Sequence, residues 1–176
     1  IQRLHVVYIM CAHVYRDMNP TLQLLRIISA LSSKKTELPL AYLKLLDLYR
    51  YSVKNRMSYF YLDAINQNRK SPMLEQVYKQ ERQKYLETLD VVARVSLLLT
   101  HENITHAVFK TIRPYKSTTV DIDIIIFRNM NSYSKSVETL RQAGYRLVIR
   151  GPRSTTLWDQ EANIGIDLYE QVAVSF

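Results

Sequence analysis

The sequence predicts an α+β fold, in which an N-terminal all-α region is followed by a mixed β-sheet packed against helices. Two changes along the chain lead to this prediction. Apolar residues recur at helical spacing over roughly the first hundred residues, and from Thr105 onward they alternate with the period of a strand. The polar stretch Asn66–Pro72 interrupts the helical part. We therefore expect a basic helical domain over residues 1–70 and an α/β core over residues 71–176.

Four helices are expected before the strands. The first covers residues 1–18, and Asn19-Pro20 either ends it or begins the second, whose apolar stripe runs over Leu22–Leu31. A third helix follows Pro39 and continues to about Asn66. The fourth begins at Ser71-Pro72, a capping residue followed by proline, and ends near Thr100.

Five strands and one further helix are expected in the second half, because β-branched and aromatic residues gather in short runs there. In chain order these elements are the strands Thr105–Thr111 and Val120–Phe127, the helix Tyr133–Ala143, and the strands Tyr145–Ile149, Ser154–Trp158 and Ile164–Glu170. Gly144 stands in the usual C-cap position of the helix, and Gly151-Pro152 predicts a turn.

The strand Val120–Phe127 carries two carboxylates on one face. Side chains alternate along a strand, so Asp121 and Asp123 point to the same side. Acids in an apolar strand are costly to bury unpaired, so they stand either at a solvent-exposed strand end or at a site for a hard divalent cation. Asp167 can join them if its strand pairs with this one.

Two other acids could take the place of Asp167. Asp159 falls in a predicted turn and Glu170 at a strand end, so Asp167 is preferred. Three carboxylates on one face would repel one another, and two divalent cations are the usual solution in sites of phosphoryl transfer.

With these residues, the chain from about residue 85 to residue 176 resembles the DNA polymerase β-like nucleotidyltransferase superfamily. That family has a helix, a strand, a phosphate loop, a strand with two acids, a helix and a later strand with a third acid. The resemblance implies a nucleotidyltransferase-type sheet and transfer of a nucleoside monophosphate from NTP to an acceptor hydroxyl. It implies Asp121, Asp123 and Asp167 as catalytic and metal-binding residues, with Mg²⁺ or Mn²⁺ as the metal.

One departure from the family concerns the phosphate loop. Where the family has a Gly-Gly or Gly-Ser pair, this chain has Lys110-Thr111, which can contact phosphate but cannot provide the close backbone approach of glycine. The expected triphosphate contacts are Lys110, Thr111 and Lys116, with Arg150 and Arg153 as further candidates.

The departure leaves a second function open, a catalytically degenerate nucleotidyltransferase-fold module that binds nucleic acid or a partner protein. A metal-dependent glycosyltransferase also uses an Asp-x-Asp motif. It is disfavoured because its apolar strand precedes the acids, whereas here Ile124–Phe127 follows them.

The formal charge of +8 lies mostly in the first half of the chain. Residues 1–72 hold eleven Lys and Arg against four Asp and Glu, a balance of +7. This balance favours RNA or DNA as a partner of the N-terminal helices, and a solvated helical surface is the alternative. Tyrosines interleaved with these basic residues could stack on bases, but their helical spacing favours packing.

The location expected from composition is the cytoplasm. Cys11 is the only cysteine, so no intrachain disulfide forms, and it is expected in a core. No apolar stretch reaches the roughly 18–20 residues that cross a membrane, so no membrane contact is expected. The identity of the acceptor, the preferred base and the oligomeric state stay open.

Overall fold

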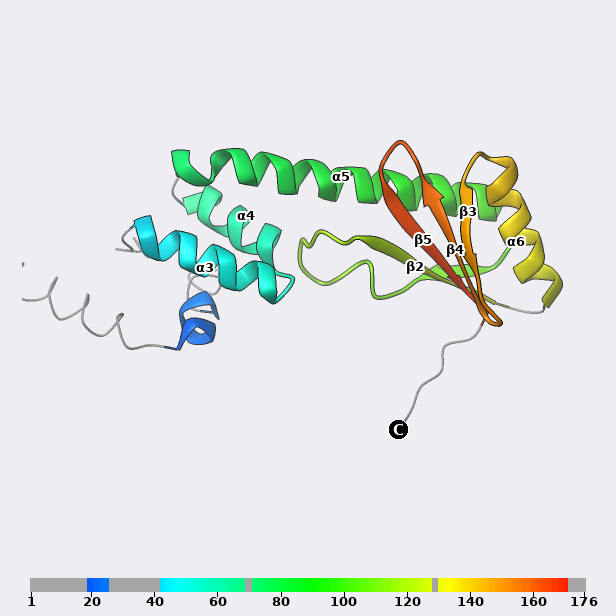
Figure 1. Ribbon diagram of the computed structural model, residues 1–176, viewed down its shortest axis with the longest axis horizontal. Helices are drawn as coiled ribbons and strands as arrows, with labels where there is room; N and C mark the ends of the chain where they lie inside the picture. Colours follow the sequence, from blue (N-terminus) through cyan, green and yellow to red (C-terminus); the bar gives the residue numbers. More distant parts are fainter. Residues whose placement is uncertain (1–18, 26–41, 69–70, 128–129, 171–176) are drawn as a thin grey trace, which may run out of the picture. The chain divides into compact units, whose positions relative to one another are not determined.

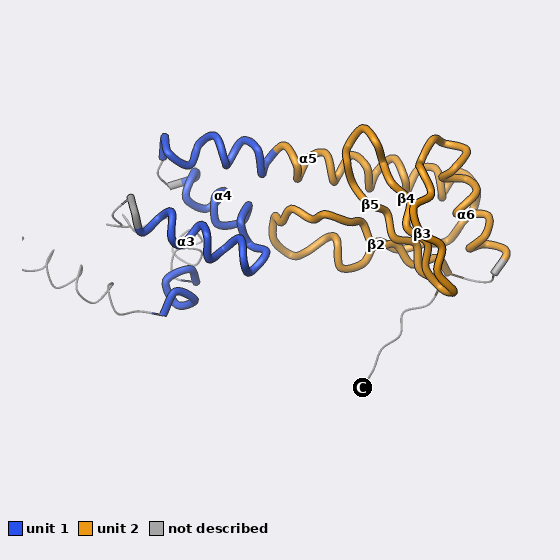
Figure 2. The backbone as a smooth tube through the Cα atoms, viewed as in Figure 1, with its two compact units in different colours: residues 1–82 blue, residues 83–176 orange. Residues whose placement is uncertain are grey.

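The computed structural model describes residues 19–25, 42–68, 71–127 and 130–170. The chain divides into two compact units, residues 1–82 and residues 83–176 (Figure 2). Helix α5, Pro72–His101, begins in the first unit and ends in the second. The boundary predicted between residues 70 and 71 therefore lies at the start of α5. The division into two compact units falls inside this helix, between Arg82 and Gln83.

The described residues of the first unit are helical. Helices α3 (Tyr42–Lys54), α4 (Ser58–Asn68) and the first turns of α5 surround one core, and residues 20–25 are helical as well (Figure 1). The buried core residues are Leu24, Leu45, Leu48, Tyr61, Leu62, Ile65 and Leu74. The predicted helix over residues 1–18, with Cys11, lies outside the described residues.

The prediction of one unbroken helix up to Asn66 is wrong, because the chain turns between α3 and α4. Arg56 has a φ of +56°, in the left-handed region. The Met57 amide donates to the Ser52 carbonyl at 2.8 Å, and the Arg56 amide donates to the Val53 carbonyl at 3.0 Å. This is the Schellman arrangement, which satisfies the last carbonyls of a helix and usually has glycine at the left-handed position. Arginine stands there instead, so the sequence carries no visible stop signal.

The second unit is a five-stranded mixed sheet, with α5 and α6 (Met130–Gln142) against it (Figure 1). The strands are β1 (His106–Val108), β2 (Asp121–Ile126), β3 (Arg146–Arg150), β4 (Ser154–Asp159) and β5 (Ile164–Tyr169). Their order in the sheet is β1-β2-β5-β4-β3, in which β2 and β5 run parallel and the other pairs are antiparallel. The predicted α+β class, helices followed by a mixed sheet, is confirmed.

One face of this sheet is buried against α5 and α6, and among the described residues neither helix covers the other face, which is called the open face. The core draws on α5, α6 and alternate strand residues, among them Val95, Leu140, Ile122, Ile124, Leu157, Ile166 and Leu168. The residues between them along β2 and β5 belong to no core cluster and point to the opposite face. The strand β3 lies at the edge, and all five of its residues are exposed.

The helix α6 ends as predicted. Gly144 has a φ of +97°, and the amides of Gly144 and Tyr145 donate to the carbonyls of Arg141 and Leu140. Over the described parts of the chain, no helix is long and apolar enough to span a lipid bilayer.

Candidate functional site

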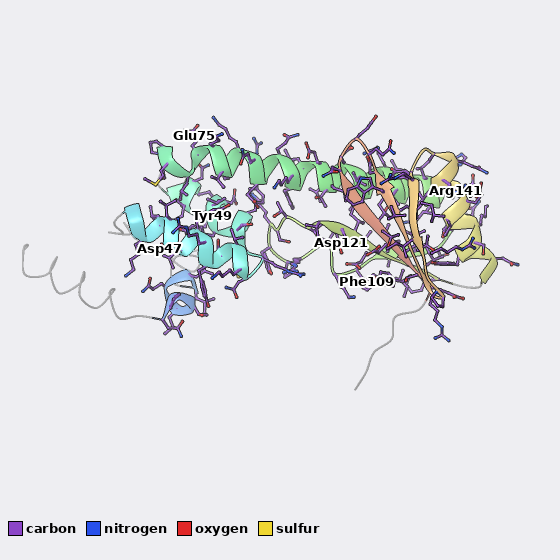
Figure 3. The ribbon with its side chains drawn as sticks, in the orientation of Figure 1. Asp47, Tyr49, Glu75, Phe109, Asp121 and Arg141 are labelled. Atoms are coloured by element: carbon purple, nitrogen blue, oxygen red, sulfur yellow. The ribbon has the colours of Figure 1, made fainter. Side chains whose placement is uncertain are left out.

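The parallel pairing of β2 with β5 brings the three predicted acids together on the open face. Asp123 is the direct partner of Asp167 in the ladder, and Asp121 is the partner of Gly165. Paired residues of neighbouring strands are about 5 Å apart, and Asp121 shares the face of Asp123 because it is two residues away. The side chains of Asp121 and Phe109, which comes from the end of β1, are marked in Figure 3.

Hydroxyl groups hold two of these carboxylates in place. Thr156 Oγ1, on β4, donates to Asp167 Oδ1 at 2.5 Å. Thr119 Oγ1, just before β2, lies 3.2 Å from Asp121 Oδ1 and 2.9 Å from the Asp121 carbonyl oxygen. Thr156 is the ladder partner of Asp167, so the pairing of β4 with β5 places its hydroxyl beside this acid. Thr119 is two residues before Asp121 in the chain.

The surroundings of the third carboxylate, Asp123, disfavour its charged form. It is only 9% exposed, and burial raises its pKa above the ordinary value. Repulsion from Asp121 and Asp167 raises the pKa further, while a hydrogen bond from Tyr169 and the charge of Lys110 act in the opposite direction. The same surroundings, burial first and then the charges of Asp123 and Asp167, raise the pKa of Tyr169 to about 12.

The loop before β2 makes a glycine-like turn although it contains lysine. Lys110 has a φ of +59°, and the Thr111 amide donates back to the Phe109 carbonyl at 2.7 Å. A left-handed conformation costs a residue with a side chain about 1 kcal/mol. The turn holds the Lys110 ammonium 4.9 Å from the ring centroid of Phe109 and 5.7 Å from that of Tyr169. These two rings meet edge to face, with centroids 5.4 Å apart, beside Asp123.

The other two predicted phosphate contacts differ in their surroundings. Thr111 is buried, and its Oγ1 accepts a hydrogen bond from the Asp123 amide at 2.8 Å and donates to the Phe109 carbonyl at 3.4 Å. Its hydroxyl therefore fixes the backbone of β2 at the acid. Lys116 is exposed on the same loop.

The further basic candidates and the alternative acids lie elsewhere. Arg150 is exposed on β3, and Arg153 follows it in the turn to β4. Asp159 is buried, 2.9 Å from Nη2 of Arg94, and accepts bonds from two turn amides. Its position in β4 puts it on the helix face, away from Asp167. Glu170 lies beyond the end of β5.

Four residues around the acids were not foreseen, namely Phe109, Thr119, Thr156 and Tyr169. Strand alternation alone places Tyr169 on the face of Asp167 and would have found it. Thr156 needed the pairing of β4 with β5, which the sequence does not reveal.

The donor set is chemically suited to a divalent cation, since Mg²⁺ and Mn²⁺ prefer carboxylate oxygens. Across the described ranges, however, no three His, Cys, Asp or Glu side chains stand close enough together to hold a metal ion. The three acids share a face of the sheet, and Asp121 and Asp167 each accept a hydrogen bond from a threonine hydroxyl. Neither the models of known protein families nor the curated protein sequences contain a match to this chain.

Proposed function

We propose that this chain is a metal-dependent nucleotidyltransferase, in which an acceptor hydroxyl attacks the α-phosphate of a nucleoside triphosphate, takes over the nucleoside monophosphate and releases pyrophosphate. The observation that carries the proposal is the register of β2 and β5, in which Asp123 and Asp167 are neighbours and Asp121 shares their face. The order of elements supports a nucleotidyltransferase-type sheet, because it agrees with the resemblance to the DNA polymerase β-like superfamily.

To hold the metal, the side chains of the three acids would have to turn toward one another from the positions that they have here. Burial, and beside it the repulsion from Asp121 and Asp167, raises the pKa of Asp123, and a divalent cation would relieve that repulsion. When bound, Mg²⁺ or Mn²⁺ neutralises charge on the phosphate oxygens during transfer. Asp167 would accept the proton of the attacking hydroxyl at Oδ2, because Oδ1 already accepts the bond from Thr156.

Lys110 is the proposed contact to the triphosphate. Its side chain is exposed and its charge acts on Asp123, so an anion bound at the carboxylates through a cation would lie within its reach. Thr111 would position β2 instead of touching phosphate, and Lys116 would add positive charge on the same loop. Positioning and charge neutralisation would supply most of the rate.

The proposed acceptor is a nucleic acid. The basic balance of residues 1–72 supports this choice, since phosphate contacts supply most of the affinity for RNA or DNA.

A degenerate module is the second candidate. It would bind nucleic acid or a partner protein without catalysis. Two observations favour it. The hydroxyl groups of Thr119 and Thr156 already occupy Asp121 and Asp167, and Lys110-Thr111 replaces the glycines of the family.

The deciding experiment is a transfer assay. The protein is incubated with Mg²⁺ or Mn²⁺, each labelled nucleoside triphosphate, and RNA, DNA or protein as acceptor. We expect transfer to RNA or DNA, and we expect Asp121→Asn/Asp123→Asn to abolish it. Asp90→Asn removes an exposed carboxylate of α5 and serves as the matched control. Transfer that survives in the double variant refutes the mechanism, and no transfer to any acceptor favours the degenerate module.

A further inference from the structure

Trp158 lies beside the acids on the open face, and the proposed chemistry does not use it. It is the single tryptophan of the chain. In the sheet it is the partner of Gly165, and Gly165 is the partner of Asp121. Trp158, Gly165 and Asp121 therefore form one row across three neighbouring strands, on the same face as Asp123 and Asp167.

The indole ring of Trp158 lies against Gly165. A β-carbon built on Gly165 would lie 3.6 Å from Cζ3 of Trp158 and 3.8 Å from Cβ of Asp121. The six-membered part of the indole therefore lies next to the glycine, and Asp121 lies next to the same glycine on the neighbouring strand. Trp158 is half-buried, so part of the ring remains accessible on the face that α5 and α6 leave open.

A cation extends this row at its outer end. Arg146 on β3 is the partner of Trp158 and is exposed. Its guanidinium can bind a phosphate through two parallel hydrogen bonds. An accessible indole between a guanidinium and a carboxylate is a combination suited to a nucleotide, because the ring stacks on the base and the cation binds the phosphate.

The row of Trp158 and Gly165 and the turn at Lys110 lie on opposite sides of the carboxylates. Lys110 stands over Phe109 and Tyr169, next to Asp123, whereas Trp158 lies in the row of Asp121, with Gly165 between the two. If the triphosphate occupies the Lys110 side, the Trp158 side is left for the molecule that supplies the hydroxyl.

We propose that Trp158 and Arg146 form a platform that stacks the terminal base of a single-stranded nucleic-acid acceptor beside Asp121. This inference rests on the proposed nucleotidyl transfer and narrows its acceptor from any hydroxyl to the end of a single strand. A protein acceptor carries no nucleobase for the indole to stack on, and transfer to protein becomes an outcome of the test.

The test uses the emission of the single tryptophan. The full chain, in EDTA, is titrated with a single-stranded oligoadenylate and, separately, with an abasic oligomer of equal length and charge. We expect saturable quenching by the oligoadenylate and much weaker quenching by the abasic oligomer. No quenching, or equal quenching by both, overturns the platform.

Variants test the two side chains separately, by fluorescence anisotropy of a labelled oligoadenylate. Loss of one stacked base should weaken binding about tenfold in Trp158→Leu, and Trp158→Phe should recover part of it. Arg146→Ala should lower the salt dependence by about one phosphate contact. Arg141→Ala, at an exposed arginine of α6, is the matched control and should bind like the wild type. Circular dichroism checks that each variant is folded, and unchanged affinity in folded Trp158→Leu overturns the inference.

The two proposals fail in distinguishable ways. The platform needs no metal, so Asp121→Asn/Asp123→Asn should keep the quenching while it loses transfer. Quenching without transfer in the wild type refutes the nucleotidyltransferase and leaves a binding site. Transfer that occurs only to protein, or that proceeds normally in Trp158→Leu, refutes the platform alone.

Discussion

At the scale of single residues, Asp123 holds a charge that its surroundings disfavour. Because its pKa is raised, the folded protein binds this proton more tightly than the unfolded chain, where the pKa of Asp is near 3.9. The folded state is thus favoured below that pH and loses stability as the pH rises through the raised pKa.

Asp123→Asn should therefore stabilise the metal-free protein at neutral pH. We expect its Tm in EDTA at pH 7 to rise above that of the wild type, and the gain to vanish near pH 3. Mn²⁺ should raise the Tm of the wild type and not that of the variant. Thermal unfolding followed by circular dichroism measures both effects, with Asp90→Asn as the control. A lower Tm of Asp123→Asn at pH 7 would contradict the argument.

Two substitutions of Lys110 distinguish the cost of its backbone conformation from the role of its ammonium group in binding. Lys110→Gly relieves the left-handed strain and should raise the free energy of unfolding by up to about 1 kcal/mol, while it removes the ammonium. Lys110→Ala removes the ammonium and keeps the strain. In urea denaturation, the free energy of unfolding of Lys110→Gly should exceed that of Lys110→Ala. The affinity for nucleotide should be lowered equally in both variants. If only the alanine variant loses nucleotide binding, the ammonium is not the contact.

The residues of the site could be predicted from the sequence only in part. The alternation of Val120–Phe127 was enough to put Asp121 and Asp123 on one face. The Thr156 hydroxyl and the Trp158 ring could not be placed, because the order of strands in the sheet depends on packing of the whole unit. The turn at Lys110 could not be foreseen either, since a left-handed lysine goes against the local preference.

At the scale of elements, the turn between α3 and α4 shows how tertiary packing overrides a helical pattern. Tyr61 on α4 is buried, and its hydroxyl donates to the Leu45 carbonyl on α3 at 2.9 Å. This contact requires the two helices to lie against each other, so the chain must reverse near Arg56. The apolar spacing that predicted one helix is present on both pieces.

Arg56→Gly should stabilise this turn. Glycine adopts the left-handed conformation without the steric cost of a side chain, so we expect the free energy of unfolding to rise by roughly 0.5–1 kcal/mol. Lys54→Gly, two residues earlier in the last turn of α3, is the matched control and should lower it by about 1 kcal/mol. Chemical denaturation of the two variants tests the assignment. A loss of stability in both would show that Arg56 itself makes contacts of greater value than the strain.

Local signals were most reliable at the ends of α5 and α6. The dipeptide Ser71-Pro72 predicted the start of α5, which begins at Pro72, and Gly144 predicted the end of α6. The Ser71 hydroxyl nevertheless makes no cap, since its Oγ is buried without a hydrogen-bond partner in the structure as described. The pairing of β2 with β5 had no local signal, because the two strands are far apart in the chain.

At the scale of the whole molecule, α5 belongs to two cores. It contributes Leu74 to the core of the first unit and Val91, Val95 and Leu99 to that of the second. A continuous helix makes folding of one core favour the helical state in the other, because propagation is easier than nucleation.

Gln83→Pro should weaken this coupling. Proline removes one backbone hydrogen bond and clashes with the carbonyl four residues earlier, at a cost of about 3 kcal/mol. Gln83 is exposed, so we expect one thermal transition for the wild type and two for the proline variant. Gln83→Ala keeps the helix and should retain one transition. Differential scanning calorimetry provides the measurement, and one sharp transition in the proline variant would mean that the units unfold together for another reason.

The parallel pairing of β2 with β5 also determines when the candidate site forms during synthesis and folding. β2 leaves the ribosome long before β5, and α6 with the β3–β4 hairpin must come between them. During synthesis Asp121 and Asp123 are therefore present before Asp167, and the three carboxylates come together only when β5 docks against β2. Closing so long a connection is slow compared with forming a hairpin, so the carboxylate face is completed at the end of folding. A nascent or partly folded chain therefore cannot start the proposed reaction before its sheet is finished.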